Sequence, residues 1–173
     1  MSGIGHFAPA FVAKSAAHTV PIWVLLVASE VNDILSVVFS ATGIEPKVVI
    51  TSMDFHQGVR YLVPVSSPWS HGLLMSIVWA VIAAALAYLF FRDRRTSALI
   101  GLVILSHWLL DFLMHSNLPL FFDGSTQVGL GLENTGTGFL FMTILDLLFL
   151  GTGVAIYFGA RFRARQNQEL TNA

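Results

Sequence analysis

The sequence predicts an all-α polytopic membrane protein with about four transmembrane helices and a short N-terminal re-entrant or interfacial helix. Of its 173 residues, 55% are hydrophobic and 11% are charged, whereas an average soluble domain has about 25% charged residues. Four stretches are also apolar enough to cross a bilayer, which takes about 20 mostly apolar residues. We expect one helical membrane domain, residues 1–160, and a cytoplasmic basic tail, residues 161–173, that is disordered beyond its basic residues.

The N-terminal segment, residues 3–17, is too short to span a bilayer. It lacks the charge order of a cleaved signal peptide, so we treat it as part of the mature protein. We expect it to lie in the interface or to re-enter the membrane packed against protein. A turn near Pro21 would then bring His6 back to about the level of Glu30, at a rise of about 1.5 Å per residue.

The four predicted spans cover residues 20–41, 69–91, 97–116 and 138–160. The first contains Glu30 and Asp33, and the fourth contains Asp146. The connecting segments 42–68 and 117–137 are expected to be loops on the outer side. Glycines in the second loop lack the strand–helix context of a phosphate-binding loop, so they predict a turn-rich cap over the bundle.

Basic residues orient the predicted bundle. They precede the first span, lie between the second and third spans, and follow the fourth: Lys14, Arg92, Arg94, Arg95, Arg161, Arg163 and Arg165. The loop between the first two spans has only Lys47 and Arg60, and the last loop has none. The positive-inside rule therefore predicts that both termini are cytoplasmic. A net charge of −1 gives no sign of a nucleic-acid partner.

The most informative motif is His107, Asp111 and His115 within an apolar helix. Their i, i+4, i+8 spacing places all three side chains on one helix face. An aspartate at the centre of a transmembrane helix costs roughly 2.5–3.5 kcal/mol. A bound metal ion, a proton path or a buried polar network could offset that cost.

Polar residues of the other spans lie at matching depths. Counting the rise from each cytoplasmic end gives about 15 Å for Glu30 and His107, about 20 Å for Asp33, Asp111 and Asp146, and about 27–30 Å for His71 and His115. Such matching predicts one shared cavity that opens outward.

Imidazoles and carboxylates together suit a divalent metal ion, with zinc expected first and iron or manganese as alternatives. The chain has no cysteine, which excludes a thiolate site. The candidate metal ligands are His107, Asp111, His115, His71 and His6. Glu30 is expected to be catalytic as a proton shuttle, and Asp33 to be catalytic, a ligand or a partner of one; Asp146 could orient a ligating imidazole.

Structural or interfacial roles, without metal binding, stay open for the same residues. His107, Asp111 and His115 could form a structural hydrogen-bond ladder. His71 and His6 could be interfacial residues, and Asp54 and His56 are expected to be solvated in a polar loop. The serines that precede His71 and His107 should point about 100° away from them, so a Ser–His nucleophile pair is not expected.

Four motifs follow one another along the chain: an early histidine in GHFAPAFVAK, the acidic segment ASEVNDIL, a Ser-His pair in PWSHGLL and H-x-x-x-D in SHWLLDFLMH. Together they resemble the bacterial inner-membrane family of membrane-bound metal-dependent hydrolases, over most of the chain. A subgroup continues, as here, with a further histidine, Leu-Pro-Leu and Gly-Leu-Gly-Leu. The chain departs from the family in having Val-Asn-Asp for Pro-Asp-x-Asp and His56-Gln57-Gly58 for His-Arg-Gly.

The resemblance implies a location in the bacterial inner membrane. It carries functional roles to His6, Glu30, Asp33, His71, His107 and Asp111, and its subgroup pattern adds His115. It also suggests metal-assisted hydrolysis.

We therefore expect hydrolysis of a lipid or other amphipathic ester or phosphoester, with membrane lipid as the partner and a homo-oligomer left open. Three other functions remain alternatives: a proton-coupled transporter, a haem-binding or assembly subunit, and a purely structural subunit.

Overall fold

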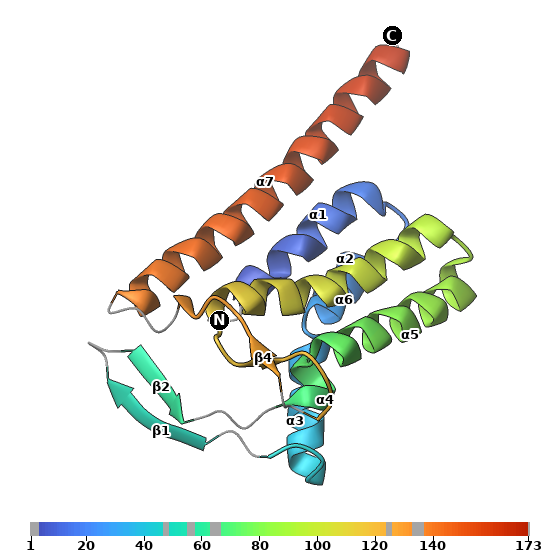
Figure 1. Ribbon diagram of the computed structural model, residues 1–173. Coiled ribbons are helices and arrows are strands. Elements are labelled where there is room, and N and C mark those ends of the chain that lie inside the picture. The colour runs from blue at the N-terminus through green and yellow to red at the C-terminus, as the bar shows by residue number, and fades with distance from the viewer. Residues whose placement is uncertain are drawn as a thin grey trace.

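The computed structural model describes residues 4–46, 49–54, 58–62, 67–123, 126–132 and 137–172. These residues form a helical bundle with two short antiparallel strand pairs in its loops (Figure 1). The helices are η1 (Ile4–Phe7), α1 (Ala8–Ala16), α2 (Ile22–Ser29), α3 (Val31–Thr42), α4 (Pro68–His71), α5 (Leu73–Phe91), α6 (Arg94–Met114) and α7 (Gly138–Asn172). The strands are β1 (Val49–Asp54), β2 (Gly58–Leu62), β3 (Leu118–Pro119) and β4 (Gln127–Val128).

Three helices of the described residues are long and apolar enough to cross a membrane. They are α5, α6 and most of α7, and each corresponds to one predicted span. The remaining predicted span is divided into α2 and α3, which are bent by 54° at Glu30. The apolar helices are therefore compatible with a membrane protein, and a fourth span requires the bent pair to count as one.

The N-terminal helix packs against protein. Ala10, Ala13 and Ala17 are buried, and α1 contacts α2, α6 and α7. Figure 1 shows α1 alongside α7, whose C-terminal end continues beyond it. The N-terminal helix therefore meets the condition that a re-entrant segment requires, which is packing against protein.

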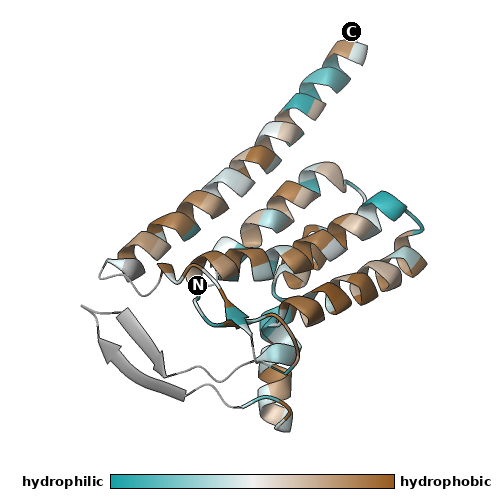
Figure 2. Cartoon of the chain, in the orientation of Figure 1, coloured by the Kyte–Doolittle hydropathy of each residue, from teal (hydrophilic) through white to brown (hydrophobic). Residues whose placement is uncertain are grey.

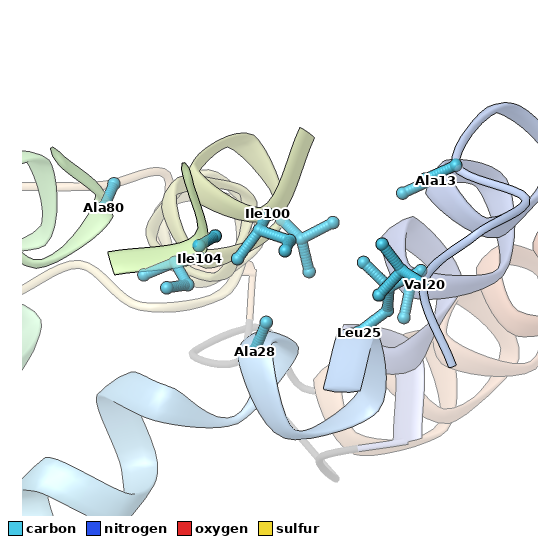
Figure 3. Packing of buried hydrophobic residues seen from close by; sticks show 11 residues of the cluster. Ala13, Val20, Leu25, Ala28, Ala80, Ile100 and Ile104 are labelled. Carbon is cyan, nitrogen blue, oxygen red and sulfur yellow. The ribbon is translucent and has the colours of Figure 1, made fainter. Parts of the chain in front are cut away.

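The apolar core joins α1, α2, α5 and α6. Small side chains of three helices, Ala13, Ala28 and Ala80, lie around Ile100 and Ile104 of α6 (Figure 3). Small residues let the helix backbones approach closely, which is the usual way that helices associate in a membrane.

Several sequence predictions about boundaries were wrong. The second span does not begin at Trp69 as one helix, because Gly72 is extended and separates α4 from α5. The tail beyond Ala160 is not disordered, because α7 continues as an exposed helix to Asn172. Figure 2 shows the change along α7 from apolar to hydrophilic residues toward the C-terminus.

The loops are also more ordered than an all-α prediction implies. β1 pairs with β2, with an irregularity between Ile50 and Ser52, and β3 pairs with β4. β-Branched residues such as Val49 and Ile50 favour strands. His56, for which a solvated position was expected, lies outside the described residues.

The described part of the loop after α6 caps the end of that helix. The amide groups of Leu130 and Gly131 donate hydrogen bonds to the carbonyl oxygens of Phe112 and His115, at 2.8 and 3.2 Å. The last carbonyls of a helix have no partner within it, so these bonds satisfy groups that would otherwise be open.

The opposite end of α6 is capped by Asp93. Its carboxylate accepts hydrogen bonds from the amides of Arg95 and Thr96. Hydrogen bonding to the Thr96 side chain, together with these amides, holds the pKa of that carboxyl below its usual range.

Candidate metal centre

Side chains from five segments converge on one point of the bundle. Their donor atoms form three overlapping groups, and within each group the atoms lie within 4.8 Å of one another. The groups are His6–His107–Asp111, Asp33–His71–His107 and His6–Glu30–Asp33. The sequence separates the first and last of these residues by more than 100 positions, and the fold brings them together as the predicted depths implied.

Asp111 lies at the centre of the cluster. Its Oδ1 lies 3.2 Å from His6 Nε2 and 3.6 Å from His115 Nε2. Its Oδ2 lies 3.4 Å from His107 Nε2 and 3.7 Å from His71 Nε2. Its side chain is 4% exposed. A buried carboxylate needs charged or hydrogen-bonded partners, and every partner that the structure gives Asp111 in these ion pairs is an imidazole.

His107 is held by the backbone at the break between α2 and α3. Its Nδ1 donates to the carbonyl oxygen of Ser29 at 2.7 Å. The end of α2 leaves such carbonyls open to other donors, and the Ser29 hydroxyl bonds back to Leu26, a contact that favours bending of a helix. In the neutral ring, Nε2 then carries a lone pair aimed at the two aspartates.

His71 is oriented through a chain of buried polar groups. Glu45, 2% exposed, accepts the amide N–H groups of Trp69 and Ser70 on Oε1. Its Oε2 accepts the Ser70 hydroxyl at 2.7 Å. The hydroxyl has one proton, so toward His71 it can only accept, and Nδ1 donates to it at 2.9 Å. Nε2 is thereby directed at Asp33, 3.1 Å away.

The histidine of η1 has the environment of a metal ligand. His6 is buried, and its ring centroid lies 3.8 Å from that of His107. Within the described part of the chain, neither nitrogen of His6 has a hydrogen-bond partner, and His107 Nε2 and Glu30 Oε1 also lack one. Buried polar atoms are rarely left unsatisfied. A divalent ion would take Nε2 of His6 and of His107 and an oxygen of Glu30, so the donor set fits a metal, and Nδ1 of His6 would need a different partner.

The cluster is closed on one side and accessible on the other. His6, His107 and Asp111 are buried, whereas the side chain of Asp33 is 49% exposed and that of His71 is 17% exposed. A catalytic metal site needs such access, because it keeps one coordination position for water or substrate.

Two predicted residues lie outside the three groups. His115 contacts Asp111, as the shared helix face predicted, but it follows the last residue of α6. Asp146 is fully buried on α7 and has interactions of its own. A role for Asp146 in orienting an imidazole therefore stays a prediction.

Sequence reasoning missed Glu45 and the contact of Ser70 with His71. The expectation that this serine points away was wrong, because α4 is a single turn that ends at His71 and not part of a regular helix. Ser106, the other serine before a histidine, bonds to its own helix as expected. Glu45 was overlooked because the loop that contains it was expected to face the solvent, whereas the Glu45 side chain is buried.

Comparison of the chain with family models, curated proteins and solved structures found no match.

Proposed function

We propose that this protein is a membrane-embedded hydrolase that depends on a divalent metal ion, with zinc the first choice, and acts on a lipid or other amphipathic ester or phosphoester. The observation that carries the proposal is the buried cluster around Asp111, in which Nε2 of His6 and Nε2 of His107 lie 3.2 and 3.4 Å from the carboxylate without hydrogen-bond geometry. We further propose that the chain belongs to the family of membrane-bound metal-dependent hydrolases, on the motifs quoted above.

The residues divide into holding and reacting roles. His6, His71, His107 and Asp111 supply the donors, and Ser29 O and Ser70 fix which ring nitrogen faces inward. A divalent ion bound there would polarise the substrate and acidify a bound water. In a centre with one ion, Glu30, in one group with His6 and Asp33, is the proposed proton acceptor, because its Oε1 has no hydrogen-bond partner among the described residues.

An apolar groove supports a lipid-like substrate. It has a volume of about 500 Å³ and is lined by residues of α1, α6 and α7, among them Ala8, Leu102 and Leu110. Leu110 precedes Asp111, and Ala8 follows His6 by two residues, so the groove and the metal centre share helix α6 and the N-terminal segment. We propose that one acyl chain of the substrate occupies it.

For the membrane, we propose four spans, with α2 and α3 together as one, in the bacterial inner membrane with both termini cytoplasmic. The absence of cysteine allows a direct test. A membrane-impermeant thiol reagent on intact cells should label Thr126→Cys, in the loop after α6, and should not label Thr171→Cys in the tail. Labelling of Thr171→Cys would overturn the orientation.

The function is tested by metal content and ester cleavage on protein purified in mild detergent. Wild-type protein should contain zinc, iron or manganese, and a His107→Ala, Asp111→Ala double variant should lack it and cleave no ester. A folded wild type that contains no metal after loading would overturn the proposal. Proton flux in proteoliposomes without ester cleavage would support the transporter alternative in its place.

A further inference from the structure

The central carboxylate has two faces that do not share their histidines. Asp111 Oδ1 faces His6, at 3.2 Å, while Oδ2 faces His107 and His71, at 3.4 and 3.7 Å. A carboxylate that binds one ion presents its oxygens to one set of donors. Here each oxygen has different nearest histidines, as in a carboxylate that bridges two ions, and the His6 and His107 donor atoms lie within 4.8 Å of each other, so the two ions would be adjacent.

The cluster also has more donors than one ion takes. Zinc in proteins is almost always four-coordinate, and a catalytic zinc has three protein ligands. The three overlapping groups contain six different residues. Asp33, His71 and His107 form one complete group of three, in which His71 and His107 are nearest Oδ2. His6, which is nearest Oδ1, forms another group with Glu30 and Asp33.

The negative charge of the cluster also favours two ions. Glu30, Asp33 and Asp111 bring three carboxylates to the cluster, with Asp111 buried and Asp33 half exposed, and the ion pairs that the structure shows for the two aspartates are all with histidines. One divalent cation would leave these carboxylates with a net negative charge. Two cations and one hydroxide would balance all three carboxylates, which matters most for the buried Asp111.

We propose that the centre binds two divalent cations bridged by Asp111: one held by Asp33, His71 and His107, the other by His6 and Glu30. Ions about 3.5–4 Å apart are a recurrent arrangement in hydrolytic phosphoesterases. The inference rests on the proposed function and deepens it, because a two-ion centre favours a phosphoester over a carboxylic ester as substrate.

The test is metal stoichiometry of the full chain in detergent, after loading with Zn²⁺ and removal of excess ion. Wild-type protein should contain two ions per chain, and His6→Gln should contain one. His18→Gln, at an exposed histidine outside the cluster, should retain two. Loading with Mn²⁺ adds a second readout, since adjacent ions give an exchange-coupled electron paramagnetic resonance spectrum that His6→Gln should convert to that of an isolated ion.

The outcomes separate the two proposals. One ion in wild type, with activity, would overturn the two-ion centre and leave the hydrolase proposal standing. No ion in folded wild type would overturn both. Two ions retained in His6→Gln would refute the assignment of the second site. If His6→Gln does not fold, Glu30→Gln makes the same test, because it removes a donor from the second site only.

Discussion

Replacement of Glu45 by glutamine tests whether a buried network sets the metal-binding form of His71. In the native protein the Glu45 carboxylate takes the Ser70 hydroxyl proton, so Ser70 accepts from His71 Nδ1. In the Glu45→Gln variant, the oxygen of the new side chain can still accept the amides of Trp69 and Ser70, but its NH₂ group donates to the hydroxyl. Ser70 must then donate to His71 Nδ1, which leaves the proton on Nε2, where it blocks coordination.

The expected loss of metal affinity follows from the position of Glu45, which orients a metal ligand without binding the ion. A residue that orients a metal ligand typically contributes 10–100-fold in metal affinity, which corresponds to about 1.4–2.7 kcal/mol. The fold should survive, because three hydrogen bonds to a carboxylate become neutral ones at a cost of about 1 kcal/mol each. Glu45→Gln should thus weaken metal binding far more than it disturbs the helices.

The assay is competition for Zn²⁺ with a chromogenic chelator, with circular dichroism and thermal unfolding measured on the same samples. Glu169→Gln, the same chemical change on the exposed end of α7, is the control and should match wild type. An unchanged affinity in folded Glu45→Gln would refute the reasoning, since it would show that His71 is not a ligand or that Ser70 does not set its tautomer.

Three further predictions concern packing, substrate and metal. In thermal unfolding, Gly153→Ala should destabilise the protein by about 1–3 kcal/mol, because the added Cβ would lie 2.7 Å from the carbonyl oxygen of Ala8. Gly151→Ala is the control and should be neutral or stabilising, because its Cβ would have no atom within 4 Å. Leu102→Trp, which fills the apolar groove, should lower kcat/KM for long-chain esters about tenfold by displacing about two CH₂ groups of the substrate. Leu109→Trp, on the same helix outside the groove, is the control and should have no effect. An equal loss with short-chain esters would argue against an acyl-chain site. Metal removal should lower the unfolding free energy by about 2.7 kcal/mol relative to protein in metal at 100 times Kd, and identical melting curves would contradict a folded-state site.

Hydropathy and helical spacing predicted much of the architecture and of the cluster. The three helices long enough to span a membrane were identified from their apolar length, and the i, i+4 relation of His107 and Asp111 from helix periodicity alone. The expected turn near Pro21 placed His6 at about the level of Glu30, and the two residues lie in one group. These features depend on the regular rise of a helix, which a sequence reports directly.

The rest depended on departures from regular helices, which periodicity does not report. The bend at Glu30 and the break at Gly72 each lie inside an apolar run that is otherwise typical of one continuous span. Glu45 was missed for a related reason. It becomes buried only because α4 turns the amides of Trp69 and Ser70 toward the loop that follows α3.

The breaks explain how a polar centre can exist at this depth. Non-helical backbone within a membrane is tolerated only where protein buries it or where it lines a cavity. At the bend, Ser29 O is satisfied by His107, and at the break before α5 the amides of α4 are satisfied by Glu45. Each interruption therefore supplies a backbone or carboxylate group that fixes one histidine. A continuous helix in place of either break would withdraw that group, and with it the orientation of a metal ligand.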